Sequence, residues 1–184
     1  SAAQRASIPE SERIRCVAGR AERVPLGDGA VEAAIATWVL QYTDDPVQAV
    51  RELARVARTR VVIVQAAARN DLVDVYNEEA RVAGLPRADH GWLLAKATEV
   101  LDAAGYACET RVLPTPVAMP RGGVSEMADI LARLHFAGHA KFAEMRAVTE
   151  PMIAERFAAG GGVMRDDGAM LVARRTAGQG SSSV

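Results

Sequence analysis

The sequence is short of cysteine, of net charge and of long hydrophobic runs, and each shortage excludes a class of function. Its two cysteines, Cys16 and Cys108, each lie in a strand-like apolar segment, which favours reduced, buried thiols over a disulfide framework. The formal net charge of −1 provides no basic field that could hold a phosphate backbone. We therefore expect small molecules or proteins as partners, and no nucleic acid.

No apolar run approaches the roughly 20 residues that a membrane-spanning helix needs, and the N-terminus lacks the basic-then-apolar order of a signal peptide. We therefore expect a cytoplasmic protein with no membrane partner. With 184 residues, 49% apolar and 24% charged, the chain has the size and composition of one ordinary globular domain.

The domain organisation follows from changes in composition along the chain. Residues 1–12 are polar without any period and indicate a flexible arm. Residues 13–175 carry the hydrophobic patterning of the folded domain, in which residues 123–158 form two lid helices hinged near Gly138. Residues 176–184 are rich in Gly and Ser, which is typical of a disordered tail.

Short apolar runs alternate with segments of helical periodicity. We expect strands at 14–18, 30–38, 60–65, 106–113 and 166–175, and helices at 46–57, 71–83, 91–104, 125–137 and 140–157. The nearly continuous apolar run at 30–38 predicts a strand buried on both faces. The alternation predicts an α/β fold with a mainly parallel sheet and helices on both faces, in which the last strand is the candidate for antiparallel pairing. The prolines at 114, 116 and 120 argue against regular structure between residues 114 and 120.

Six short motifs, in this order, resemble the class I methyltransferases that use S-adenosylmethionine. They are Gly19-Arg-Ala-Glu-Arg-Val-Pro-Leu26, Val31-Glu32, Val39-Leu-Gln-Tyr42, Asp45-Pro46, Arg51-Glu-Leu-Ala-Arg-Val-Ala57 and Leu101-Asp-Ala-Ala-Gly-Tyr106. The resemblance extends from about residue 14 to residue 174. It implies a Rossmann-like sheet with a helical lid insertion, and a small-molecule methyltransferase as the parent activity.

The sequence departs from the family pattern at the cofactor site. The family's Gly-rich loop, which lets backbone approach the ligand closely, and its first two strands have no counterpart here. Arg20 stands where the family has an aspartate that contacts the adenine. The resemblance therefore implies that the chain alone binds no cofactor. If a missing segment is supplied, S-adenosylmethionine is the expected cofactor, with Arg20, Ala21 and Glu22 contributing to its site.

The order of the strands in the family's sheet shows what the missing segment would cost the fold. The family's strands run third, second, first, fourth, fifth, seventh, sixth, so the missing pair belongs between the strands at 14–18 and 30–38. Unpaired buried backbone groups cost roughly 1–3 kcal/mol each, and a bare apolar edge invites another chain. We therefore expect a second protein chain that completes the sheet, either in a hetero-oligomer or in a homodimer.

Candidate substrate-binding residues come from the expected carboxyl edge of the sheet and from the helices that follow it. They are Thr37, Trp38, Gln41, Tyr42, Tyr76 and His135. Trp38 and Tyr42 are as well explained as core or interface aromatics, and Thr37 and Gln41 as caps of the helix at Asp45.

The remaining candidate groups have weaker support. His135 and His139 share a helical spacing but have no evident third ligand, so we expect no metal site and prefer a lid-lining or surface role for them. His90, between Asp89 and Trp92, fits a loop contact better than acid or base catalysis. No catalytic residue is assigned, and Cys108 is not expected to act as a nucleophile.

The leading interpretation is a methyltransferase-fold subunit of a heteromeric small-molecule enzyme in specialised metabolism. Alignment of reacting atoms and exclusion of water could support a cofactor-free displacement or ring closure on such a fold. One alternative is a fragment of an active S-adenosylmethionine-dependent methyltransferase. The other is a non-catalytic partner that stabilises an active homologue.

Overall fold

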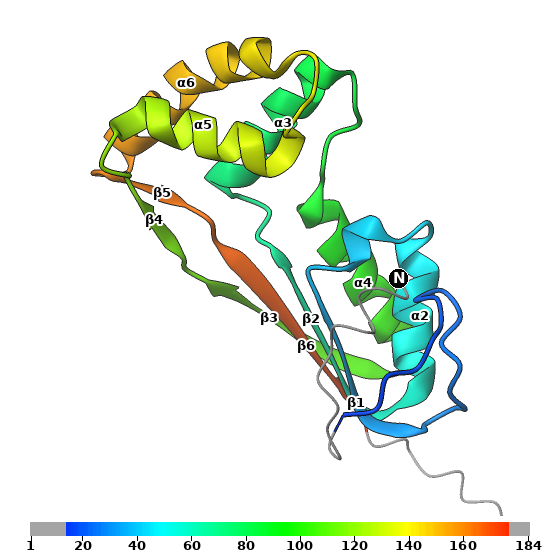
Figure 1. The fold of residues 1–184 in the computed structure, drawn as a ribbon. Helices are drawn as coiled ribbons and strands as arrows, with labels where there is room; N and C mark the ends of the chain where they lie inside the picture. Colours follow the sequence, from blue (N-terminus) through cyan, green and yellow to red (C-terminus); the bar gives the residue numbers. More distant parts are fainter. Residues whose placement is uncertain (1–13, 177–184) are drawn as a thin grey trace, which may run out of the picture.

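A four-stranded sheet forms the centre of the computed structural model, which describes residues 14–176. The strands are β1 (Val31–Thr37), β2 (Ala57–Ala66), β3 (Tyr106–Leu113) and β6 (Gly168–Arg175), in the spatial order β1-β2-β6-β3 (Figure 1). This is the order expected for the fourth, fifth, seventh and sixth strands of the family's sheet.

The predicted mainly parallel pairing is wrong for the described strands. Only β1 and β2 pair in parallel, while β6 is antiparallel to both of its neighbours. The reason is that the chain turns back between the short strands β4 (Pro116–Ala118) and β5 (Val163–Arg165), so β5 and then β6 return antiparallel to β4 and β3. The expected antiparallel last strand and the edge position of β3 are confirmed.

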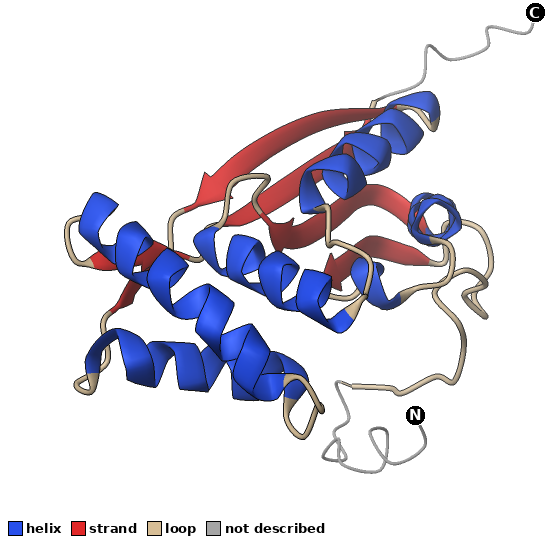
Figure 2. Ribbon diagram, turned by 90° about the horizontal axis from the view of Figure 1, so that it is seen from above, coloured by secondary structure: helices blue, strands red, loops and turns tan. Residues whose placement is uncertain are grey.

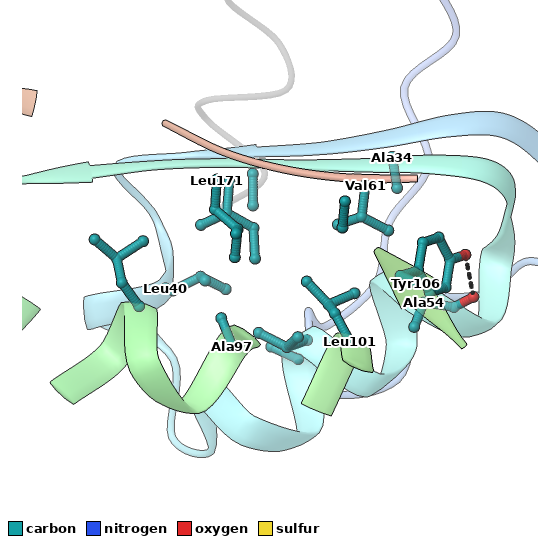
Figure 3. Packing of buried hydrophobic residues seen from close by; sticks show 14 of the residues in the cluster. Ala34, Leu40, Ala54, Val61, Ala97, Leu101, Tyr106 and Leu171 are labelled. Atoms are coloured by element: carbon teal, nitrogen blue, oxygen red, sulfur yellow. Dashed lines mark hydrogen bonds between the residues drawn. The ribbon is translucent and has the colours of Figure 1, made fainter. Parts of the chain in front are cut away.

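Two helices, α2 (Pro46–Val56) and α4 (His90–Ala103), cover one face of this sheet (Figure 2). Asp45 fixes the start of α2, because its side chain accepts a hydrogen bond from the Gln48 amide at 2.9 Å and proline occupies the first helical position. Between the helices and the sheet lies an apolar cluster (Figure 3), whose labelled members are Ala34, Leu40, Ala54, Val61, Ala97, Leu101, Tyr106 and Leu171. The Tyr106 hydroxyl reaches across it and donates to the Ala54 carbonyl.

Three further helices, α3 (Asp71–Ala83), α5 (Gly123–Phe136) and α6 (Phe142–Ala159), pack on one another beyond the ends of the strands (Figure 1). They enclose a second apolar cluster that includes Val75, Leu131, Ile153 and Phe157. We call these three helices the helical layer. Gly84, with φ of +77°, ends α3 in the left-handed conformation that glycine adopts most easily.

The proline-rich segment after β3 contains regular structure, contrary to expectation. Residues Pro116–Ala118 form β4, which pairs antiparallel with β5 in a separate two-stranded sheet. Proline is tolerated here because the short strand has a partner on one side only, so a missing amide donor can face outward.

The expected strand at residues 14–18 is also wrong. Ile14 makes only an isolated bridge and residues 15–19 have no regular structure, with Ile14 and Val17 more than half exposed. Cys16 is exposed as well, so its predicted burial is wrong, whereas Cys108 is partly buried. The predicted arm at residues 1–12, and all of the predicted tail except Thr176, lie outside the described residues.

The second face of the sheet carries apolar side chains that no described helix contacts. The expectation that β1 is buried on both faces is therefore wrong: Ala34 and Ala36 are buried, whereas the side chain between them, Ile35, is 68% exposed. In register with Ile35 lie the partly exposed Val62 of β2 and Val172 of β6. β1 is also an edge strand among the strands of residues 14–176, so this open face meets an edge that no described strand pairs with.

Candidate functional site

The carboxyl ends of β1 and β2 lie side by side, where open α/β sheets bind ligands. β1 ends at Thr37, and the next residue, Trp38, has φ of +52°, the only positive φ of a non-glycine residue within residues 14–176. Its amide still donates to the Val64 carbonyl at 2.9 Å. The chain then enters a short 3-10 turn, η1 (Leu40–Tyr42). A bulky residue held in this conformation is strained, and such strain concentrates at functional sites.

The four residues predicted at this edge follow one another along β1 and η1. Thr37 is exposed opposite Val64, on the open face of the sheet. Trp38 is 41% exposed and Tyr42 80% exposed. The Gln41 amide donates to the Trp38 carbonyl at 3.2 Å, and its buried carbonyl oxygen has no partner among the described residues. Neither Thr37 nor Gln41 caps α2, because Asp45 itself does so.

Two buried polar residues at the same end of the sheet were not assigned to the site from the sequence. Gln65, next to last in β2, is fully buried, and neither of its side-chain polar atoms has a partner within residues 14–176. His90, at the start of α4, is 91% buried; its ring meets the Trp38 ring edge-on at 6.4 Å, and its Nδ1 also lacks a described partner. The signal for Gln65 was present in the sequence, as a lone amide closing a run of apolar residues.

Burial lowers the pKa of His90, against the opposing effect of the neighbouring Asp89 carboxylate. The ring is therefore neutral at physiological pH. The buried polar atoms at this end of the sheet that lack described partners belong to two amides and one neutral imidazole, which can offer and accept hydrogen bonds.

The three residues predicted for a cofactor site form a turn beside the segment that leads into α2. The Glu22 carboxylate accepts a hydrogen bond from the Asp44 amide at 2.8 Å, while Ala21 packs against the main apolar cluster. The Arg20 guanidinium pairs with the carboxylates of Glu22 and Asp44. The fold thus brings residues 20–22 close to the carboxyl edge, with Arg20 already engaged by two acidic groups.

The described residues do not form a cradle for S-adenosylmethionine by themselves. The segments that follow β1 and β2, residues 38–45 and 67–70, contain no glycine, so neither offers bare backbone for close approach of a ligand. The turn at residues 20–22 could contribute to such a site only alongside other segments.

The other two predicted residues, Tyr76 and His135, meet in the helical layer. Their rings are 5.2 Å apart in an edge-on arrangement, and Tyr76 also stacks on Phe136 at 5.7 Å. The Nδ1 atom of His135 lies 2.6 Å from a carboxylate oxygen of Glu79, a residue that sequence reasoning missed. No group of His, Cys, Asp and Glu side chains in the described range is arranged to hold a metal ion.

The largest cavities do not coincide with these residues. A cavity of about 570 Å³ lies between α2 and α4 and is lined in part by Arg55 and Arg175. Both guanidinium groups are already bonded, Arg55 to Glu52 and Asp28, and Arg175 to carbonyls and the Tyr106 hydroxyl. A smaller cavity of about 290 Å³ at the start of α3 is lined mostly by ion-paired side chains. In each of these two cavities, several lining side chains are therefore already paired with other residues of the chain.

Comparison with known proteins supports the class that the fold indicates. Residues 1–64, about a third of the chain, match the family model described as a methyltransferase domain. A candidate methyltransferase from Bacillus halodurans superimposes with a TM-score of 0.61 at 18% identity, covering 90% of this chain and 79% of the other. Comparison with curated proteins gives no match.

Two further solved structures share the fold. A candidate methyltransferase from an antibiotic biosynthesis pathway of Anabaena variabilis has a TM-score of 0.60 at 13% identity, over 94% of this chain and 78% of that one. A candidate methyltransferase solved in complex with the Trm112 methyltransferase activator of Haloferax volcanii has a TM-score of 0.54 at 14% identity, over 92% and 65% of the two chains.

These matches and the sheet order define a protein of the class I methyltransferase fold, and they confirm the resemblance to that family. No described helix is long and apolar enough to cross a membrane.

Proposed function

We propose that this chain is a methyltransferase-fold subunit of a heteromeric enzyme that acts on a small molecule in specialised metabolism. The observation that carries the proposal is the open face of the sheet beside the unpaired edge of β1. Ile35, 68% exposed, lies at the centre of this surface. Apolar side chains beside free backbone donors and acceptors form a surface that another polypeptide can both pair with and cover.

A different chain fits this surface better than a second copy. Two copies that paired antiparallel through their β1 edges would be related by a twofold axis perpendicular to the sheet. Such an axis keeps the helices α2 and α4 of both copies on the same side, so both open faces would remain exposed. One partner that pairs with the edge and also covers the face satisfies both needs. The complex of the Haloferax volcanii protein with its activator is a precedent for a partner chain on this fold.

The small-molecule role is supported by the polar groups at the carboxyl edge. Gln41, Gln65 and His90 present buried hydrogen-bonding atoms without described partners, and Trp38 provides an aromatic wall. These uncharged groups suit a polar, neutral substrate rather than a polyanion. The Anabaena variabilis neighbour comes from an antibiotic pathway, which supports a biosynthetic setting for the fold.

A cofactor-free displacement or ring closure is the second candidate reaction. The glycine-free segments after β1 and β2 favour it, because the described residues offer little to a sulfonium nucleoside. Titration calorimetry of the purified chain with S-adenosylmethionine tests this point. We expect no binding by the chain alone, whereas tight binding would contradict this candidate and favour ordinary methyl transfer.

The test of the heteromeric proposal is the solution behaviour of the full chain, measured by sedimentation velocity and by urea unfolding. We expect self-association or incomplete cooperativity in the absence of the partner. The variant Ile35→Lys, which places a charge on the open face, should reduce self-association. Ile130→Lys is the matched control, since Ile130 is also exposed, at 46%, but lies on α5 in the helical layer.

A soluble, monomeric and cooperatively unfolding wild-type chain would overturn the heteromeric proposal. Equal effects of the two lysine substitutions on self-association would also count against it. The open face would then contribute no more to association than another exposed apolar position. A stable homodimer that dissociates in Ile35→Lys would replace the heteromer by a symmetric assembly.

A further inference from the structure

We infer that His135 is a general base of this enzyme and that Glu79 positions it. The inference rests on the proposed small-molecule function and deepens it by naming a residue that removes a proton from the substrate. It starts from the contact between the Glu79 carboxyl group and the His135 ring in the helical layer, which neither the resemblance nor the comparisons assign.

Glu79 lies on the inner side of α3 and its side chain is 0% exposed. One carboxylate oxygen lies 2.6 Å from His135 Nδ1, and the other has no partner among the described residues. A buried carboxyl group with a single bond is costly, and an apolar side chain would pack there at lower cost. The contact with His135 is therefore the feature of Glu79 that calls for an explanation.

We assign the acceptor role in this short contact to the Glu79 carboxylate, so the imidazole presents its N–H at Nδ1. The lone pair of the neutral ring is then on Nε2. Nε2 makes no hydrogen bond within the described residues, and it is not one of the buried polar atoms that lack a partner. The His135 side chain is 17% exposed. The base is therefore both oriented and reachable.

The surroundings of the imidazole indicate what kind of molecule it meets. Tyr76 meets the His135 ring edge-on at 5.2 Å and Phe136 does so at 6.2 Å, so aromatic surface adjoins the base. We assign to this site an apolar or aromatic small molecule that bears an ionisable O–H or N–H group. In the step, the O–H or N–H bond of the substrate breaks, its electron pair stays on the substrate, and the proton bonds to Nε2. The Glu79 carboxylate balances the charge of the imidazolium that forms.

His139 provides an internal contrast four residues along the chain. It is partly exposed, and its Nδ1 accepts a hydrogen bond from the Lys141 amide at 3.1 Å. A neutral His139 therefore carries its proton on Nε2, the opposite tautomer to that inferred for His135. The two rings can be compared in the same sample.

The first experiment reads the tautomers by long-range ¹H–¹⁵N correlation spectra of the full chain labelled on histidine. We expect the Nδ1–H form for His135 and the Nε2–H form for His139. Glu79→Gln replaces a group that only accepts with an amide that can accept or donate, so the preference of His135 for the Nδ1–H form should weaken. Glu78→Gln is the control, because Glu78 pairs with Arg81 on the same helix, and it should change neither ring.

The second experiment measures the rate at which diethyl pyrocarbonate modifies each histidine, followed by peptide mass spectrometry. Reaction requires a free lone pair, so Glu79→Gln should slow modification of His135 by roughly tenfold or more and leave His139 unchanged. An Nε2–H tautomer of His135 in the wild-type chain would reduce the pair to a packing contact and overturn the inference.

Both readouts need neither substrate nor partner chain, so they separate this inference from the proposed function. A monomeric chain with the expected tautomers would contradict the heteromeric proposal and still support His135 as a base. If Glu79→Gln does not fold, the wild-type tautomer alone still decides, because only the Nδ1–H form is compatible with a free Nε2.

Discussion

Gln65 provides the sharpest quantitative test of the site, because replacing it with an apolar residue should make the free chain more stable. Its side chain is fully buried at the end of β2, and both amide atoms lack partners within the described residues. A buried polar atom without a hydrogen bond costs about 1–3 kcal/mol. Gln65→Met removes both such atoms at nearly constant volume, and the repacking penalty of such a swap is usually below about 1.5 kcal/mol.

We therefore expect a net gain of about 1–3 kcal/mol in the free energy of unfolding, equivalent to a rise in Tm of roughly 2–10 °C for a chain of this size. Urea unfolding followed by circular dichroism, with the m-value checked for constancy, measures the gain. The expected loss is in function, since the same amide is a candidate for hydrogen bonding to a substrate.

Asn70 is the matched control for this prediction. It is also a buried amide, but its Nδ2 donates to Asp166 and to the Asp167 carbonyl at 3.0 and 2.9 Å, and its Oδ1 caps α3. Asn70→Leu should therefore destabilise the chain by about 2–4 kcal/mol. If Gln65→Met destabilises the chain as Asn70→Leu does, then Gln65 has an interior partner such as a buried water, and the argument that it awaits a ligand is refuted.

Three further predictions concern the frame around the site. Tyr106→Phe should lower the free energy of unfolding by about 1–3 kcal/mol in urea, because the hydroxyl donates to the Ala54 and Ala57 carbonyls; an unchanged midpoint would show that those carbonyls are satisfied otherwise. Gly84→Ala should cost about 1 kcal/mol by the same assay, since φ is +77° there, and a neutral result would mean that α3 ends differently in solution. His90 has a lowered pKa, so the unfolded chain binds its proton more readily and stability falls as pH drops from about 7 to about 5; His90→Gln should flatten this slope, and parallel pH profiles would contradict the burial argument.

Local signals in the sequence predicted the elements whose ends are fixed locally. The structure has α3 at residues 71–83 and β3 at 106–113, as expected, because Asn70 and Gly84 bound the first and Gly105 and Pro114 bound the second. The capping of α2 by Asp45 was equally readable. In each case the decisive hydrogen bond or backbone conformation lies within a few residues of the signal.

The failures arose where a distant partner decides the structure. Residues 14–18 have the composition of a strand, but a strand forms only where its backbone pairs with a neighbour, and these residues pair with none of the strands described in residues 14–176. Pro116 forms part of a strand because residues almost fifty positions later pair with it. Burial of β1 on both faces was inferred from continuous apolarity, which cannot tell a covered face from one that is left open.

The candidate site shows the same division. Thr37, Trp38, Gln41 and Tyr42 were placed at the carboxyl edge because the edge follows from the strand positions. The importance of Gln65 and Glu79 depends on what each side chain lacks or meets in three dimensions, and the periodicity of a helix or strand does not contain that information. His135 was selected from the sequence, but its carboxylate partner lies 56 positions away.

The bonds of Asn70 have a mechanical consequence. The two apolar clusters are separate, one under the sheet and one inside the helical layer, and this amide ties the first turn of α3 to the residues just before β6. A second tie joins the Asn77 amide, midway along α3, to the backbone of Ala88 ahead of α4. Any tilt of the helical layer as a rigid body must therefore keep or break both ties, and the Glu79–His135 pair belongs to a layer that is fastened at two points.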